Sequence, residues 1–339
     1  MTAPQSNTST IVLLLASAMS LPACEKSAGD KPASAGSAIK AEPTGAASAA
    51  PSSAASAAPS SAASAAPSSA ASAVASGTAS APAADGMLAI PKVDEAKPEG
   101  AALSAYRIDK HEVTAAQYQG CVDAGACKPQ KTVQSESLKP LTWNAFCNLG
   151  VAGREQHPMN CVDWNNADAY CKWAGKRLPT EAELAHIAFA GKDQKYPWGD
   201  AEPTAKLLNA CDTACKAALK EKGENWGSLY PMTAGTVDDG FVGTAPVGSY
   251  PDGAASSGAL DVAGNVWEWT ADWYSPSMAP QPSKQDPTGP ASGSRKTMRG
   301  GSWNDFRANM VDNKARFGFL PVERFANAGF RCAQSAAAK

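Results

Sequence analysis

Short runs of alternating apolar and polar residues after residue 100 predict four β-strands. They are residues 105–109, 245–250, 296–300 and 329–333. A period of two is typical of a strand that has one buried face. The folded part of the chain therefore contains β-structure, and its pattern begins near Met87.

Capping residues predict three helices between these strands. The helices at 114–122 and 180–190 each open with a capping box, in which a Thr is followed three residues later by Gln or Glu. The helix at 163–174 has Asp163 as its N-cap and Gly175 as its stop. Strands and helices that do not alternate regularly predict an α+β fold.

Residues 191–295 are rich in Gly, Pro, Asn and Asp, and they predict turns and loops more than regular structure. Loops of that length inside a compact domain must be fixed by disulfides, ions or buried aromatic side chains. The chain has nine Trp and nine Cys, which can supply two of these.

The N-terminus predicts export. Ile11–Met19 is an apolar run too short to span a bilayer as a helix, and residues 1–23 have the pattern of a signal peptide. Leu21–Cys24 resembles the lipobox of bacterial lipoproteins, in which the signal is cut before the cysteine and the cysteine carries lipid. We therefore expect lipidation at Cys24 and attachment to a membrane of the bacterial cell envelope, in the periplasm or at the outer membrane. An ordinary cleaved signal peptide with an incidental cysteine is the alternative.

A low-complexity segment at 24–86 follows this signal. Residues 49–72 repeat the octamer Ala-Ala-Pro-Ser-Ser-Ala-Ala-Ser three times. Such a segment has few large apolar groups to offset the entropy of ordering, and its prolines oppose helix. It is predicted to be a disordered tether, and residues 87–339 are predicted to be the folded domain.

The number of cysteines favours disulfides over zinc, and the net charge gives no support to nucleic-acid binding. Eight cysteines remain when Cys24 is set aside, and an even number in an exported chain predicts disulfides. No Cys-x-x-Cys spacing occurs, so zinc is not expected. A net charge of −2 and a pI of about 6.0 give no electrostatic argument for nucleic acid as a partner.

Several motifs, in order along the chain, carry a family resemblance. They are Ile108–Thr114, His157–Trp164, Ala169–Glu183, Tyr196–Gly199, Asp239–Phe241, Leu260–Trp269, Arg299–Trp303 and Asn327–Cys332. Together they resemble the formylglycine-generating enzyme, or sulfatase-modifying factor, family. The resemblance implies that family's fold, a variant of the C-type lectin fold that is low in regular secondary structure.

The resemblance also implies disulfides. Cys171 would pair with Cys332. A second family disulfide would join positions near Ala188 and near Asn313 or Ala315, where this chain has no cysteine. For the other cysteines, proximity in the sequence favours the pairs Cys121–Cys127, Cys147–Cys161 and Cys211–Cys215.

The family binds structural calcium, and the resemblance maps two sites onto this chain. The first would use the Asn225 and Asp239 side chains with the carbonyls of Trp226 and Phe241; the second would use Asp261 with carbonyls at Val262, Gly264 and Val266. Hard oxygen donors on Gly- and Asn-rich loops suit calcium. The alternative is that these Asp and Asn side chains only cap turns.

The family's oxidase chemistry uses copper on two cysteines that follow the Gly-Gly-Ser motif. Counting from Gly300, these positions are Asp305 and Met310; counting back from Cys332 gives Trp303 and Ala308. No cysteine lies between Cys215 and Cys332, and thiolates are what Cu(I) prefers. Copper is therefore not an expected cofactor.

Other residues of the family's cleft are retained. Trp267, Ser302 and Arg316 match cleft positions, and Asp305 is expected near its floor. Trp267 is equally well explained as a core aromatic residue.

Three functions remain open. The first is an envelope lipoprotein that binds an unknown protein or peptide, or has a structural role. The second is an enzyme with different chemistry in the same cleft, with Asp305 as acid or base. The third is formylglycine generation with a rearranged site. Whether the chain is an enzyme is left open, and the missing cysteines favour the first reading.

Overall fold

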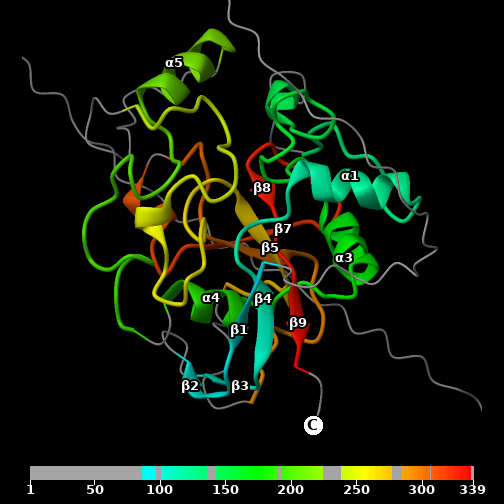
Figure 1. Cartoon of the computed structure of the whole chain (residues 1–339), viewed down its shortest axis with the longest axis vertical. Coiled ribbons are helices and arrows are strands. Elements are labelled where there is room, and N and C mark those ends of the chain that lie inside the picture. The colour runs from blue at the N-terminus through cyan, green and yellow to red at the C-terminus, as the bar shows by residue number, and fades with distance from the viewer. Residues whose placement is uncertain are drawn as a thin grey trace, which may run out of the picture. The chain divides into compact units, whose positions relative to one another are not determined.

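The computed structural model describes residues 86–96, 101–135, 143–189, 192–223, 238–276, 285–305 and 307–336. All of them belong to one compact unit, Ser76–Lys339 (Figure 1). Its α-helices are α1 (Ala115–Asp123), α3 (Trp164–Trp173), α4 (Glu181–Phe189) and α5 (Thr213–Glu221). Within the described ranges, three short 3-10 helices lie at Asn144–Phe146, Pro251–Gly253 and Ala308–Met310.

The described strands form three small sheets. A four-stranded sheet has the order β7 (Arg316–Phe319), β6 (Lys296–Arg299), β5 (Trp267–Trp273), β8 (Ala328–Gly329). A three-stranded sheet has the order β1 (Met87–Ile90), β4 (Tyr106–Asp109), β9 (Ala333–Ser335). A hairpin pairs β2 (Val93–Ala96) with β3 (Ala101–Leu103). This mixture of helices and small sheets confirms the α+β class and the low content of regular structure.

The three predicted helices are present, and their caps form as expected. Thr114 and Gln117 form both halves of the capping box of α1. Asp163 caps α3 through the amide of Asn166. Thr180 accepts from the amide of Glu183, and the Glu183 carboxylate accepts from the amide of Thr180. Local hydrogen bonds of this kind can be identified from sequence because both partners lie within one turn.

Aromatic side chains fill the main core, where α1 packs beside α3 and α3 packs against β5 (Figure 1). The rings of Tyr118 and Tyr170 stack with centroids 5.7 Å apart, and Phe330 meets them edge-on at 6.4 and 5.4 Å. A second cluster groups Trp143, Phe146 and other residues around two disulfides. The loops are thus held by buried aromatic side chains, as their length requires.

Two predicted strands differ from the structure. Residues 245–250 form turns, because Pro246 cannot donate to a ladder and Gly248 has a φ of 79°. The amide of Val247 bonds instead to a carbonyl of a distant loop, that of Gln156. The predicted strand 329–333 is split between β8 and β9.

Four disulfides link the described residues. Cys171 pairs with Cys332, as the family resemblance implied, and ties α3 to the segment before β9. The three pairs favoured by proximity, Cys121–Cys127, Cys147–Cys161 and Cys211–Cys215, also form. Ala188 and Ala315, where the family's second disulfide would lie, line one small cavity.

Among the described residues, none of the helices is both long and apolar enough to cross a membrane. Residues 1–85, which include the predicted signal, Cys24 and all but the last residue of the predicted tether, lie outside the described part of the chain.

Candidate functional site

The loop after β6 holds Asp305 in a closed set of hydrogen bonds. Its Oδ2 accepts from the Ser302 amide at 2.7 Å and lies 2.9 Å from the Ser302 hydroxyl. Ser302 also meets Asn304 at 2.8 Å, and Asn327 donates to both Ser302 and Asn304. Ser302 is fully buried, while Asn304 and Asp305 are 7% exposed.

Burial raises the pKa of Asp305 to about 7, and hydrogen bonds from Ser302 and from the Trp267 side chain act in the opposite direction. Two of the predicted cleft residues, Trp267 and Ser302, therefore do meet at Asp305. A carboxyl group with a pKa near neutrality can hold or release a proton at physiological pH.

Trp267 lies in the interior, on β5. Only 5% of it is exposed, and it belongs to the main core cluster with Met298. Its ring meets the ring of Phe317 edge-on at 5.2 Å, and Phe317 is 41% exposed. This burial agrees with a core role for Trp267, and the surface above it is formed in part by Phe317.

The sheet separates Arg316 from Trp267. Phe317, the neighbour of Arg316 on β7, is the residue that meets Trp267, and neighbours on a strand point to opposite faces. Arg316 instead makes a bidentate pair with Glu181 at 2.6 and 2.8 Å and donates to the Ser275 carbonyl. Arg316 was expected in the same cleft as Trp267, and the structure does not bring the two together.

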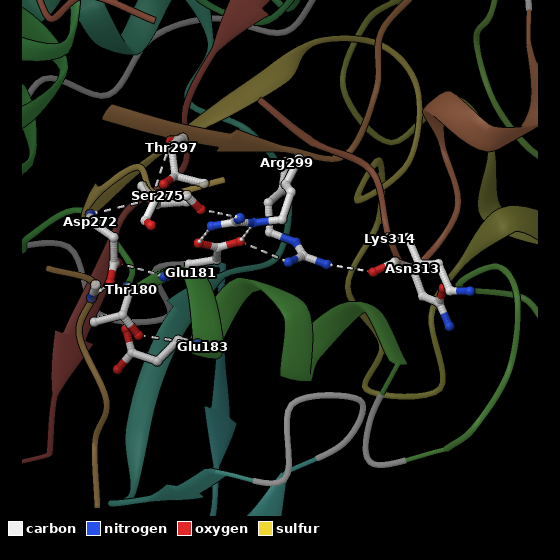
Figure 2. Close-up of polar contacts among 12 residues, drawn as sticks. Thr180, Glu181, Glu183, Asp272, Ser275, Thr297, Arg299, Asn313 and Lys314 are labelled. Carbon is white, nitrogen blue, oxygen red and sulfur yellow. Dashed lines mark hydrogen bonds and ion pairs between the residues drawn. The ribbon is translucent and has the colours of Figure 1, made fainter. Parts of the chain in front are cut away.

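Glu181 is the centre of a buried ion cluster at the beginning of α4. Arg299 also donates to it, at 2.9 Å, and to the Asn313 carbonyl, while the Glu181 amide donates to Asp272 (Figure 2). Burial alone would raise the pKa of Glu181, but the two arginines outweigh it and hold the pKa below its usual value. The cluster joins α4 to β6 and β7.

The described residues do not fit a copper dithiolate. Each of the eight cysteines from Cys121 to Cys332 is part of a disulfide. At one counted copper position, Asp305 is already bonded to Ser302. Counting back from Cys332 puts Trp303 at the same copper position, and the indole N–H of Trp303 donates to the Ala326 carbonyl. Thiolates, which suit Cu(I), are thus absent from this described loop.

The first expected calcium site is described only in part, because Asn225 and Trp226 lie outside the described residues. Asp239 accepts from the amides of Phe241 and Ala210 at 2.9 and 3.2 Å. This is the turn-capping arrangement that we considered as the alternative. The carboxylates of Asp212, Asp238 and Asp239 nevertheless place ligand atoms within 4.8 Å of one another. Burial raises the pKa of Asp239 to about 7, and Asp212 adds to the effect.

The second expected calcium site would use Asp261 and carbonyls of the loop before β5, and two of these carbonyl oxygens lie near Gly300. A Cβ on Gly300 would lie 3.1 Å from the Val262 carbonyl oxygen and 4.0 Å from that of Val266, so both oxygens lie close to the Gly300 backbone. Asp261 has a φ of 53° and accepts from the Gly248 amide. Oxygen donors on a tight loop fit calcium.

Sequence reasoning missed a buried charge cluster beside this loop. Glu112, Glu268 and Arg331 all lie within the motifs that carried the resemblance, yet they are at most 1% exposed. The sequence contained no signal that three residues so far apart meet, because only tertiary packing brings them together.

The fold and site together define a disulfide-stabilised α+β domain that has buried ion clusters and a hydrogen-bonded acidic loop. The chain belongs to the family described as the sulfatase-modifying factor enzyme 1-like domain, whose model matches residues 57–336.

Known members of the family include close and more distant relatives of this chain. It is 40% identical over 190 residues to the formylglycine-generating enzyme of Streptomyces coelicolor, covering 55% of each chain. It is 35% identical over 193 residues to the inactive C-alpha-formylglycine-generating enzyme 2 of Mus musculus, covering 55% of this chain and 52% of that one. The chain thus spans about half the length of these curated relatives.

The solved structure of PvdO from Pseudomonas aeruginosa has a similar fold. The TM-score is 0.54 at 22% identity, and the match covers 74% of this chain and 94% of PvdO. At that identity the likeness concerns the fold alone.

Proposed function

We propose that this family member is an envelope lipoprotein whose folded domain binds a peptide or protein partner and does not act as a copper oxidase. The observation that carries the proposal is the state of the cysteines. All eight that lie in the described residues form disulfides, so none of them offers a thiolate to Cu(I).

The loop after β6 supports the same conclusion. Ser302 hydrogen-bonds to one carboxylate oxygen of Asp305 there through its amide and its hydroxyl, and Asn327 donates to Ser302. A relative named as inactive is 35% identical to this chain, so absence of the oxidase activity has a precedent within the family.

The N-terminal sequence supports an envelope location. Cys24 lies in a lipobox-like motif, and a repeat of Ala, Pro and Ser separates it from the folded domain. We expect the substitution Cys24→Ser to abolish labelling by a radioactive fatty acid and to release the protein from membranes. Retention of the label in this variant would contradict the lipid anchor.

Copper binding tests the main proposal. Purified protein is titrated with Cu(I) in competition with bicinchoninate, next to an Asp305→Cys/Met310→Cys variant that restores two cysteines. We expect the wild type to leave the copper with bicinchoninate and the variant to withdraw about one equivalent. Withdrawal of a full equivalent by the wild type would contradict the proposal.

A second candidate function rests on one observation, the pKa of Asp305 near 7. An enzyme that uses Asp305 as acid or base would need the carboxyl group itself. Asp305→Asn keeps the shape of the side chain and removes the titration. If this variant complements a deletion strain fully, acid–base catalysis by Asp305 is excluded.

A further inference from the structure

One side of helix α1 is exposed and carries almost no charge. α1 lies beside α3 at the periphery of the domain (Figure 1). Its exposed positions include Ala116, Gln117 and Gly120. The one charged residue of α1, Asp123, is the last of the helix. The exposed face of a helix in water ordinarily carries charged side chains, whereas the centre of a protein–protein interface is depleted of them. This face of α1 therefore has the composition of an interface.

A hollow of about 420 Å³ opens at the N-terminal half of this face. It is lined in part by Ala115 and Ala116 of α1 and by Val151 and Ala152 of the adjacent loop. These side chains are small, so they leave the space open. Pockets of roughly 300 Å³ and more hold small molecules, so the hollow has room for an aromatic side chain.

The loop that forms the other wall of the hollow is fixed against α1. The amides of Ala115 and Ala116 donate to the carbonyls of His157 and Glu155, both at 2.9 Å. The Cys147–Cys161 disulfide closes the loop at its base. A surface that is held in this way loses little conformational entropy when it binds.

An exposed tryptophan lies one turn further along the same face. Trp173, the last residue of α3, is 46% exposed, and its Cη2 would lie 3.9 Å from a Cβ on Gly120. Ala116 and Gly120 are four residues apart, so they are neighbours on one side of the helix. Val151, in the wall of the hollow, is 41% exposed. Exposed apolar side chains that gather in one place mark interaction sites.

The glycine at position 120 also favours a contact at this face. Glycine in the interior of a helix is less stable than alanine. A Cβ at this position would meet Trp173 at an ordinary contact distance, so the described residues leave room for alanine. A position without a Cβ lets another backbone come close to the helix.

We propose that this face of α1 is the contact surface between two copies of the chain, which pair about a two-fold axis and place Trp173 of each copy in the hollow of the other. The hollow lies beside Ala116 and the tryptophan beside Gly120, at opposite ends of one short face. A two-fold axis that crosses α1 between them sets the two helices antiparallel and exchanges these ends, so that each tryptophan meets a hollow.

The lack of charge on the face favours a second copy as the occupant. Two copies that pair about a two-fold axis present the same residues to each other. A charged face would then bring like charges together, which is costly. On α1 the one charge is at the end of the helix, where Asp123 accepts from Gln119 at 2.7 Å. The contact also closes after two copies, because each supplies one tryptophan and one hollow.

Sedimentation of the purified full chain, in detergent matched in density to the buffer, tests the proposal over a range of concentrations. We expect a reversible monomer–dimer equilibrium. In Ala116→Arg the dissociation constant should rise about tenfold or more, because the contact would bury a charge without a partner. Ala217→Arg makes the same substitution at an exposed position of α5 and is the matched control. It should dimerise as the wild type does.

Two outcomes would overturn the proposal. One is a wild type that stays monomeric at every concentration, whether this face is bare or is taken by a different protein. The other is a dimer whose dissociation constant is unchanged in Ala116→Arg, which would place the contact elsewhere. Val151→Lys, on the exposed loop, covers the case in which Ala116→Arg does not fold, and it should weaken the dimer in the same way.

Discussion

Asp305 shows how the interior changes the chemistry of one side chain. The sequence placed it after the Gly-Gly-Ser motif and close to Trp267, and the structure places both Trp267 and Ser302 against it. Counting residues from the Gly-Gly-Ser motif was enough to locate Asp305 in the sequence. It could not show that the carboxyl group is buried or that Ser302 satisfies one of its oxygens, because burial is decided by segments distant in the chain.

The pKa of Asp305 makes stability depend on pH. In the unfolded chain this carboxyl group loses its proton near pH 4, whereas in the fold it keeps the proton up to about pH 7. The folded state therefore binds more protons over this range, and the contribution of Asp305 to the free energy of unfolding falls as pH rises from 4 to 7.

In Asp305→Asn this contribution disappears. Relative to the wild type, the variant should gain up to about 4 kcal/mol between pH 4 and pH 7, the value of a three-unit shift at about 1.4 kcal/mol per unit. Urea unfolding at several pH values measures this, with the exposed Asp252→Asn as control. If the free energies of unfolding of Asp305→Asn and the wild type change in parallel with pH, the buried carboxyl group does not titrate in this way.

At the scale of elements, three of the four described α-helices were predicted, whereas α5, within the segment expected to form turns and loops, and several strands were not. The caps of α1, α3 and α4 depend on residues within one turn, so their sequence signals are local. β5 and β7 were missed because neither alternates cleanly: most residues of β5 are buried, and in β7 an apolar residue, Phe317, is the exposed one. The pairing of β5 with β8 joins residues about 60 positions apart, which no local pattern reports.

The Glu181 cluster should be a strong link between α4 and the sheet. Glu181→Gln would leave Arg299 and Arg316, both largely buried, without their carboxylate. Loss of one partner of a buried ion pair costs about 3–5 kcal/mol. Urea unfolding should show a loss of this size, while the exposed Glu221→Gln should change the free energy of unfolding by less than about 0.5 kcal/mol. A small effect of Glu181→Gln would mean that the arginines find other partners.

The disulfides should differ in their contributions to stability. The Cys171–Cys332 disulfide closes a sequence separation of 161 residues and the Cys211–Cys215 disulfide one of 4. Loop-closure entropy then gives about 5 kcal/mol for the first and about 2 kcal/mol for the second. Double Cys→Ala variants of each pair, compared by urea unfolding, should keep this order. Equal losses would indicate that entropy of the unfolded chain is not the main cause.

At the scale of the whole molecule, the family could be identified from sequence because its motifs recur in order along the chain. The family model and the 40% identity to a formylglycine-generating enzyme agree with that reading. The roles of individual residues did not follow in the same way. Arg316 matched a cleft position, yet it pairs with Glu181, and Glu112 went unnoticed although it lies inside a quoted motif.

The most direct test of the whole account is a turnover experiment. The purified protein, loaded with copper in air, is incubated with a sulfatase-type Cys-x-Pro-x-Arg peptide, and aldehyde formation is followed by mass spectrometry. The account predicts no aldehyde, because the cysteines of the described domain are held in disulfides. Aldehyde formed by the wild type at a rate that depends on copper would contradict the central claim and would require a copper site that does not use these cysteines.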